Sequence, residues 1–403
     1  MINHTITKRT RGGLCALLLG LLGAGSLHAQ IVTLGNFTGA GNGSVPIDGV
    51  IFSGTTLYGT ANQGGANSAG TVFSLPIGGG TITALASFSS STNPSAGVVL
   101  SGTTLYGSTS GGGAAGYGTV YSLSISGGPI TTLGSFASGN GLPFDTPILS
   151  GTKLYGTTLS GGTLHNGSVY SIPTSGGTPT TLASFNIANG ASPFSSLTLS
   201  GTLLYGTTSA GGANSKGTVF SVSTLDGTIT TLASFNGTNG NDPETDLTLS
   251  GTMLYGTTYS GGANNDGTVF SINTLDGTIT TLASFSGANG QGPLSGVTLN
   301  GNTLYGTTKW GGANNKGTVY SLDLTTGVLT TLDTFNGTNG ANPEGDLTLI
   351  GSALYGTTAN GGTSNSGTVF SIAIQAVPEP STWAMALGGL ALLSLRPHRR
   401  RHA

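Results

Sequence analysis

Charged residues are scarce in this chain of 403 residues, of which they make up 6%. Ordinary soluble domains carry roughly 25%. Disordered chains usually combine low hydrophobicity with a high net charge, whereas this chain has regularly spaced apolar positions and a formal net charge of −2. The composition therefore predicts a folded chain rather than a solvated, disordered one.

Positive charge is nearly absent from the middle of the chain. Residues 31–376 contain four lysines, no arginine and twelve acidic residues, which gives this segment a net charge of −8. A protein that binds nucleic acid needs a basic surface to neutralise the phosphates. We therefore expect no nucleic-acid partner.

Cysteine and histidine are also rare. The single cysteine, Cys15, excludes an intramolecular disulfide and a site built from several thiolates. A serine triad needs a histidine, and the segment 29–397 has only His165, which lies in a turn-like Leu-His-Asn-Gly run. We expect a fold held by packing and backbone pairing, with no Ser-His-Asp triad.

Glycine is abundant, with 73 residues, and it marks a repeat of about 50 residues that occurs seven times. Each unit divides into four short segments of alternating apolar and polar residues, separated by glycine-containing turns. Several copies of four short strands are typical of β-propeller blades. The run Leu-Tyr-Gly-Thr, or Leu-Tyr-Gly-Ser in the second unit, begins at Leu57, Leu105, Leu154, Leu204, Leu254, Leu304 and Leu354.

The ends of the repeat indicate how the ring closes. The motif of the fourth segment already occurs at residues 31–37, and the last unit stops after its third segment, near Ile374. Pairing the first strand with the last three leaves no open blade edge. We therefore predict an all-β fold in which residues 30–376 form a seven-bladed β-propeller of four-stranded antiparallel blades, closed by the N-terminal strand.

The repeat resembles two known families. The spacing of Leu-Tyr-Gly-Thr-Thr, Gly-Gly and Gly-Thr-Val-Phe is similar to that of a kelch blade, although the later tryptophan of that blade is missing, and it supports the strand order. The unit is more similar to the glycine-rich GloVer repeat of Gloeobacter- and Verrucomicrobia-type proteins over residues 31–376. This resemblance implies a tandem-repeat fold and no particular activity.

The N-terminal residues 1–29 have the features of a secretory signal peptide. Lys8, Arg9 and Arg11 precede a short apolar run at 14–22, and residues 26–29 form a cleavage site. We expect a terminal helix that directs export and is removed by signal peptidase near Ala29.

The C-terminal residues 377–403 resemble the PEP-CTERM sorting signal of Gram-negative bacteria. An apolar run at 383–395 is short for a permanent span, and the arginines after it favour the cytoplasmic side. The resemblance implies a second terminal helix, transient inner-membrane attachment, processing by an exosortase-like enzyme, and a final location in the cell envelope, at the outer surface or in the extracellular matrix. An ordinary tail anchor is the alternative. The motif residues are Val377, Pro378, Glu379, Pro380, Arg399, Arg400 and Arg401.

Strand order also predicts which face binds. Short turns join the first strand to the second and the third to the fourth, so the two longer loops of each blade share the opposite face. Binding residues concentrate on loops that a rigid scaffold carries, and we expect the binding surface on this long-loop face. The candidate binding residues are Asp242, Glu244, Asp246, Tyr259, Trp310, Glu344 and Asp346.

The two acidic runs, 241–246 and 342–346, allow three interpretations. They are solvated loop residues, oxygen ligands for calcium, or a carboxylate pair for glycoside hydrolysis. Trp310 either stacks on a sugar ring or covers a loop. The sequence favours a non-enzymatic binding scaffold for an extracellular polysaccharide or a surface protein, with no catalytic, metal or cofactor site. A carbohydrate-active enzyme and a purely structural matrix component are the alternatives.

Overall fold

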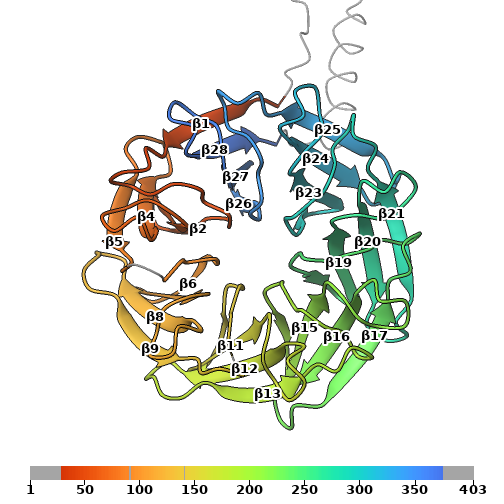
Figure 1. The fold of residues 1–403 in the computed structure, drawn as a ribbon. Coiled ribbons are helices and arrows are strands. Elements are labelled where there is room, and N and C mark those ends of the chain that lie inside the picture. Colours follow the sequence, from red (N-terminus) through yellow and green to blue (C-terminus); the bar gives the residue numbers. More distant parts are fainter. Residues whose placement is uncertain (1–28, 90–91, 140, 375–403) are drawn as a thin grey trace, which may run out of the picture.

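The computed structural model describes residues 29–89, 92–139 and 141–374. In these residues, 28 strands form seven four-stranded antiparallel sheets arranged in a ring (Figure 1). The predicted seven-bladed propeller is therefore confirmed. The two expected terminal helices and the sorting motif from Val377 to Arg401 lie outside the described residues. Within the described part, no helix has the length and apolarity needed to cross a membrane.

We number the blades 1 to 7 in chain order. Within each blade, the first strand lies nearest the centre of the ring and the fourth lies at its outer edge. The innermost strands are β2 (Ile51–Ser53), β6 (Val98–Ser101), β10 (Ile148–Ser150), β14 (Thr198–Ser200), β18 (Thr248–Ser250), β22 (Thr298–Asn300) and β26 (Thr348–Ile350). The second strands are β3 (Thr56–Ala61), β7 (Thr104–Thr109), β11 (Lys153–Thr158), β15 (Leu203–Thr208), β19 (Met253–Thr258), β23 (Thr303–Thr308) and β27 (Ala353–Thr358).

The two outer positions complete each blade. The third strands are β4 (Thr71–Pro76), β8 (Thr119–Ser124), β12 (Ser168–Pro173), β16 (Thr218–Ser223), β20 (Thr268–Asn273), β24 (Thr318–Asp323) and β28 (Thr368–Ala373). The outermost strands are β5 (Thr83–Ser87), β9 (Thr131–Ser135), β13 (Thr180–Ser184), β17 (Ile229–Ser234), β21 (Ile279–Ser284), β25 (Leu329–Thr334) and, for blade 7, β1 (Ile31–Asn36).

The N-terminal strand closes the ring as the sequence predicts. β1 pairs with β28, and Ile31 lies opposite Ile372. The Asn36 side chain accepts a hydrogen bond of 3.1 Å from the backbone N–H of Thr363, which ties this strand to the last long loop of the chain. Closure therefore uses both backbone pairing and a side chain of the first strand.

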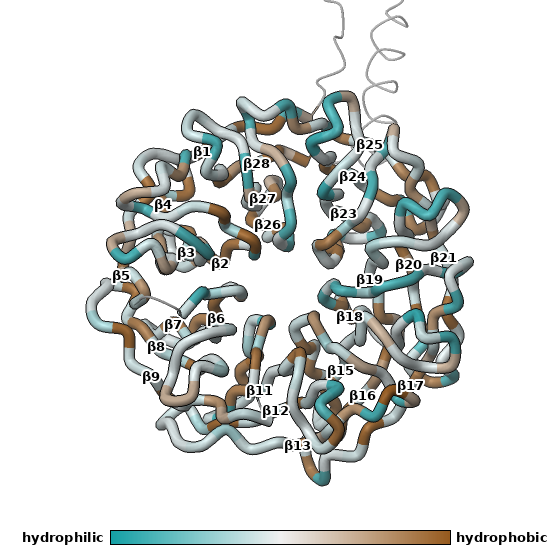
Figure 2. Tube along the Cα trace, in the orientation of Figure 1, coloured by the Kyte–Doolittle hydropathy of each residue, from teal (hydrophilic) through white to brown (hydrophobic). Residues whose placement is uncertain are grey.

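The apolar positions of each strand pack between blades, and brown and pale segments alternate along every blade (Figure 2). One cluster joins Val219 and Phe235 of blade 4 to Leu254 and Phe270 of blade 5. Every blade interface contains an edge-to-face aromatic contact, with ring centroids 4.9 to 5.1 Å apart, a geometry that aromatic pairs prefer. The pairs are Phe37–Phe73, Phe88–Tyr121, Phe136–Tyr170, Phe185–Phe220, Phe235–Phe270, Phe285–Tyr320 and Phe335–Phe370.

The threonines of the repeat are buried and hydrogen-bonded, as buried polar groups must be. In blade 4, the hydroxyls of Thr208 and Thr218 lie 2.8 Å apart, at the ends of the second and third strands. The preceding residue, Thr207, donates a bond to the backbone oxygen of Thr245 in blade 5. The Gly-Thr-Thr part of the repeat thus fastens strands within a blade and one blade to the next.

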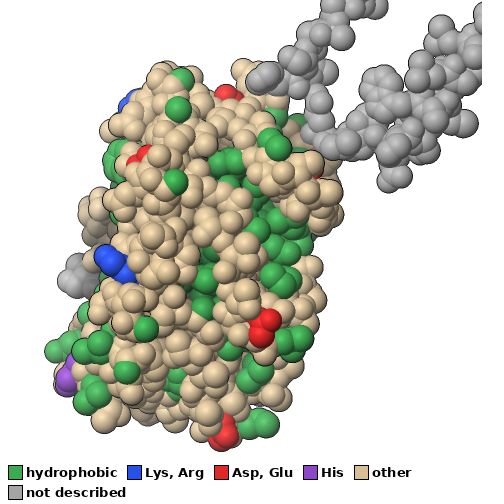
Figure 3. Space-filling model, turned by 90° about the vertical axis from the view of Figure 1, so that its right-hand side faces the viewer, with side chains coloured by type: hydrophobic (Ala, Val, Ile, Leu, Met, Phe, Trp, Pro, Cys, Tyr) green, Lys and Arg blue, Asp and Glu red, His purple; other side chains and the backbone are tan. Residues whose placement is uncertain are grey.

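The outer edges of the blades are almost uncharged, with Asp333 as the single charged side chain in the seven outermost strands. Exposed edges invite pairing with other chains, and bulges are one way to prevent it. Each outermost strand pairs with its neighbour through a register shift. The side of the ring accordingly shows mainly uncharged polar and backbone atoms (Figure 3).

Candidate functional site

The long loop before each innermost strand contains a proline, and one to three of the residues that follow it line a cavity near the axis of the ring. The residue before the proline has a left-handed backbone in all seven blades, although only blade 6 has glycine there, Gly292. Such a conformation costs roughly 1–2 kcal/mol for other residues. Backbone bonds hold it: the Asp242 N–H donates to Lys216, and the Asp242 oxygen accepts from the Tyr259 N–H. The prolines are Pro46, Pro94, Pro143, Pro193, Pro243, Pro293 and Pro343.

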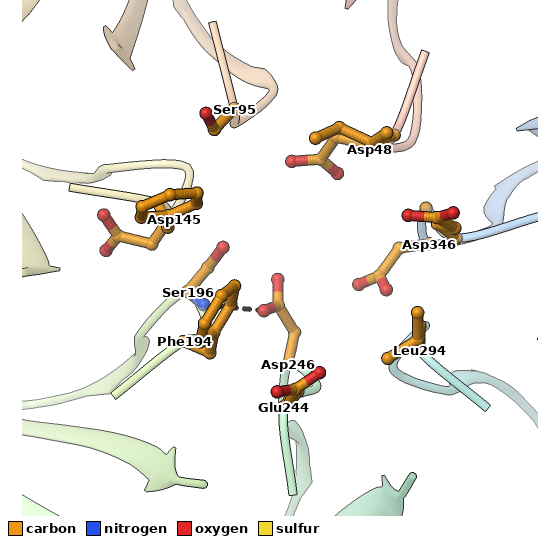
Figure 4. A pocket seen from close by; sticks show the side chains of 13 residues that line it. Asp48, Ser95, Asp145, Phe194, Ser196, Glu244, Asp246, Leu294 and Asp346 are labelled. Carbon is orange, nitrogen blue, oxygen red and sulfur yellow. Dashed lines mark hydrogen bonds between the residues drawn. The ribbon is translucent and has the colours of Figure 1, made fainter. Parts of the chain in front are cut away.

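The residues after these prolines surround a cavity of about 190 Å³ on the ring axis. Its inner part is acidic, because the carboxylates of Asp48, Asp246 and Asp346 point toward its centre (Figure 4). These three residues come from blades 1, 5 and 7. We call this cavity the axial pocket.

Backbone N–H groups of neighbouring blades hold the three central carboxylates. Asp246 accepts from Ser196 and Asp346 accepts from Gly296, both at 2.6 Å. Asp48 accepts from the Gly97 N–H at 2.6 Å and from the Thr146 hydroxyl at 2.7 Å. The carboxylates are therefore positioned by the blade arrangement.

Burial changes the protonation of this group. It raises the pKa of Asp246 to about 6, and the charge of Asp48 adds to the rise. Burial also raises the pKa of Asp346 well above its usual range, followed by the charges of Asp246 and Asp48. Desolvation and like charges both favour the neutral carboxylic acid, so Asp246 and Asp346 bind protons more readily than free aspartates do.

The rim of the axial pocket is partly apolar and partly acidic. Phe144 and Phe194 of blades 3 and 4 lie with ring centroids 5.2 Å apart. On the other side, Glu344 forms an ion pair of 2.9 Å with Lys309. Burial, together with the charges of Asp242 and Glu344 and against that of Lys309, raises the pKa of Glu244 to about 7. The rim thus combines an apolar surface with two glutamates, one of which is paired with a lysine.

Two aromatic side chains lie next to this rim, and we call them the aromatic pair. Tyr259 and Trp310 approach each other across Gly292, where an added Cβ would lie 2.9 Å from the Tyr259 ring and 3.5 Å from the Trp310 ring. Trp310 is 37% exposed. The Lys309 ammonium lies 5.6 Å from the centre of the Trp310 ring. Lys309 therefore joins the aromatic pair to Glu344 and the pocket.

The structure separates residues that are adjacent in the acidic runs. Glu244, Asp246, Glu344 and Asp346 line the axial pocket, whereas Asp242 is not part of its lining. The carboxylates of the two acidic runs that meet are thus about 100 residues apart in sequence, with glutamates from one residue after the proline and aspartates from three residues after it.

Sequence reasoning missed Asp48. Blade 1 has an aspartate two residues after its proline, and this position is the signal that could have identified it. In blade 3 the equivalent residue, Asp145, turns into its own blade, where it accepts a 2.6 Å bond from the Thr157 N–H. Chain spacing alone does not distinguish the two orientations.

The acidic runs also suggested calcium. Among the residues that the structure describes, no group of three or more histidine, cysteine, aspartate or glutamate side chains is arranged to hold a metal ion. One oxygen of each central aspartate already accepts an N–H bond, and a donor hydrogen competes with a cation for that oxygen.

Comparison with known proteins agrees with the repeat. The model of the Gloeobacter/Verrucomicrobia repeat matches residues 25–143, 89–265, 137–305 and 204–379, which together cover most of the chain. The chain belongs to the Gloeobacter/Verrucomicrobia repeat family. No curated protein matches it.

Two solved structures with TM-scores above 0.5 agree with the fold of this member of the repeat family, and a third is similar with a lower TM-score. A putative 6-phosphogluconolactonase from Bacteroides uniformis has a TM-score of 0.51 and 15% identity, covering 76% of this chain and 91% of that chain. An oligogalacturonate lyase in complex with manganese has a TM-score of 0.51 and 12% identity, covering 89% and 96%. BamB from Moraxella catarrhalis has a TM-score of 0.46 and 17% identity, covering 85% and 84%. At these identities the likeness concerns the fold alone.

Proposed function

We propose that this protein is an exported envelope or matrix component whose long-loop face binds a polysaccharide. The observation that supports it most is the Lys309–Glu344 ion pair, which joins the exposed aromatic pair to the axial pocket. Aromatic rings offer flat faces on which apolar sides of a ligand pack. Carboxylates accept hydrogen bonds, so sugar hydroxyls suit the rest of the site.

The size and charge of the axial pocket restrict the kind of ligand that can bind. At about 30 Å³ for each water, a cavity of about 190 Å³ has room for an end group or branch rather than a chain. Two glutamates and three central aspartates line the pocket, and the lysine paired with one of these glutamates is Lys309. Like charges destabilise an acidic ligand, and we expect neutral or amino-bearing polysaccharides to bind and uronate polymers to bind poorly.

The positions of the chain ends support this arrangement. The short turns between strands lie on one face, and Ile31 begins β1 and Ala373 ends β28 at that face. The expected cuts by signal peptidase and by an exosortase-like enzyme therefore concern chain that leaves the face opposite to the binding site. Attachment at either end keeps the long-loop face free.

A fluorescence titration tests the binding proposal. Trp310 and Trp383 are the two tryptophans of the chain, so Trp383→Phe leaves Trp310 as the reporter. We expect a neutral glucan or an amino polysaccharide to shift its emission and a uronate polymer to leave it unchanged. In pull-down measurements, Trp310→Ala should weaken binding at least about tenfold, or about 1.4 kcal/mol.

Ile187→Ala is the matched control, since Ile187 is 56% exposed on a long loop between blades 3 and 4. Equal loss of binding in both variants, or equal binding of neutral and uronate polymers, would contradict this site.

A second candidate function rests on the two rim glutamates. With a pKa of about 7, Glu244 holds a proton near neutral pH, while Glu344 is paired with Lys309. A carboxyl group with a raised pKa near a second carboxyl group is typical of acid–base pairs. If the protein is a carbohydrate-active enzyme, Glu244→Gln should abolish cleavage of a bound polysaccharide, while binding of the polysaccharide persists. Retention of intact polysaccharide by the wild type favours the binding scaffold.

A further inference from the structure

Asp333 breaks the pattern of the outermost strands. It lies opposite Val319 in blade 6. The equivalent position, opposite the same valine of the repeat, is glycine or alanine in the other six blades, at Gly35, Ala86, Gly134, Ala183, Ala233 and Ala283. The Asp333 carboxylate is partly buried, and the seven outermost strands contain no other charged side chain.

The Asp333 side chain holds the first residue of the closing strand. Its Oδ2 atom accepts a 2.7 Å hydrogen bond from the backbone N–H of Ile31, and its Oδ1 atom accepts a 2.8 Å bond from its neighbour Thr334. Within the described residues, no other ionisable side chain hydrogen-bonds or ion-pairs with Asp333. The contact thus joins blade 6 to the start of the last strand of blade 7.

Blades 4 and 5 hold the start of their outermost strand through their own turns. In blade 4, Asp226 accepts from the N–H of Thr228, just before the outermost strand, and Asp276 and Thr278 do the same in blade 5. The outermost strand of blade 7 follows no such turn, because it comes from the other end of the chain. By register, Gln30 corresponds to Thr228 and Ile31 to Ile229, so Asp333 of the neighbouring blade holds this strand one residue further on, at its first residue.

We propose that Asp333 is the binding site for the amino terminus that forms when the signal peptide is removed. Hydrolysis after Ala29 adds water across the peptide bond and leaves a carboxylate on Ala29 and an ammonium group on Gln30. This ammonium adjoins the residue whose N–H Asp333 already holds, and a cut after Gln30 places it on that very nitrogen. The uncut chain has only neutral amides there, so processing strengthens the contact with a charge pair.

This inference rests on the proposed export, because without cleavage there is no ammonium group. The measurable effect of this contact is a change in the pKa of the α-amino group, which is ordinarily about 7.7–8.0. A carboxylate beside the ammonium favours the charged form, so we expect an upward shift of roughly 0.5–1 unit. The resulting stabilisation is full below pH 8 and is lost as the pH rises through the shifted pKa.

The experiment uses the protein exported and processed by its own route. Mass spectrometry identifies the first residue, and pH-dependent labelling of the α-amino group gives its pKa. We expect Asp333→Asn to return this pKa to the ordinary range. The matched control Asp226→Asn, at a carboxylate that contacts its own turn, should leave it raised.

The outcomes separate the two proposals. An uncut chain overturns both the export proposal and this inference. A chain cut so that Gln30 or Ile31 is first, with an α-amino pKa that is the same in the wild type and in Asp333→Asn, overturns the inference alone. A first residue elsewhere, or an amino group blocked by cyclisation of Gln30, also overturns it.

Discussion

Removing the hydroxyl of Tyr320 is expected to stabilise the protein. The hydroxyls of Tyr121, Tyr170 and Tyr320 are buried and have no hydrogen-bond partner among the described residues. Burial also raises the pKa of Tyr320 far above its usual range, so the group is a neutral, unpaired phenol at pH 7. Leaving a polar group buried and unpaired costs roughly 1–3 kcal/mol.

The other blades show what replaces the hydroxyl. The equivalent residue is phenylalanine in blades 1, 4, 5 and 7. In blade 4, both Phe220 and the Leu197 methyl crowd the place where a Cβ on Gly206 would lie, at 2.7 and 3.0 Å. Blade 6 has the shorter Val297 where blade 4 has Leu197. Blades 4, 5 and 7 thus combine the phenylalanine with a leucine, and blade 6 combines the tyrosine with a valine. Blade 1 combines phenylalanine with a valine, Val50, so phenylalanine is also tolerated beside the shorter side chain.

The expected change in the free energy of unfolding combines the gain from removing the unpaired hydroxyl with the loss from the gap that it leaves. Tyr320→Phe removes the unpaired group and leaves a gap of about 10–15 Å³, which costs about 0.3 kcal/mol at 24 cal/mol per Å³. We expect a net gain of about 1–2 kcal/mol in the free energy of unfolding. Adding Val297→Leu should fill the gap, whereas the reverse change Phe220→Tyr should destabilise, because Leu197 already fills that space.

Denaturant unfolding, followed by fluorescence at pH 7, measures these differences through the transition midpoint at constant slope. Tyr121→Phe should behave like Tyr320→Phe and add to it, because the residues lie in separate blades. A loss of more than 1 kcal/mol in Tyr320→Phe would refute the reasoning. It would mean that the phenol makes a hydrogen bond, for example to a buried water.

Three further predictions follow from the same structure. The free energy of unfolding should fall as the pH rises from 4 to 7, because a carboxyl group with a raised pKa, about 6 for Asp246, stabilises the fold only while its proton is bound. We expect a fall on the order of 1–3 kcal/mol, and Asp246→Asn should make it smaller. The same pH profile in the wild type and in Asp246→Asn would contradict this prediction. Deleting residues 31–37 should give aggregated protein in size-exclusion chromatography, because blade 7 loses its outermost strand and the Phe37–Phe73 contact; a soluble truncation with the wild-type melting temperature would contradict ring closure. Phe235→Ala should cost about 3–5 kcal/mol in denaturant unfolding, because Phe235 is fully buried in the interface of blades 4 and 5; a loss below 1 kcal/mol would show that this interface adds little.

Local patterns predicted the fold well, since each strand is set by nearby residues. The Leu-Tyr-Gly-Thr run that begins at Leu254 lies in β19, Met253–Thr258. The segment 31–37, expected to be the closing strand, contains β1, Ile31–Asn36. The alternation of apolar and polar residues and the glycine turns suffice here, because the same solution is repeated seven times.

The site was predicted only in part. The exposed loops and the rare residues Trp310 and Tyr259 could be identified because they depart from the repeat. The placement of both rings beside Gly292 could not, since it depends on the backbone of a third loop. The ion pair of Lys309 with Glu344 likewise joins loops of different blades.

The sequence by itself determined the repeat, the number of blades and the strand that closes the ring, because backbone pairing and alternation act over a few residues. Only the tertiary structure decided which carboxylates meet. Seven copies of one loop converge on a common axis, so Asp48, Asp246 and Asp346 lie together although about 100 to 300 residues separate them. It also gave Asp333 its partner, because a ring closed by its own ends places Ile31 beside blade 6.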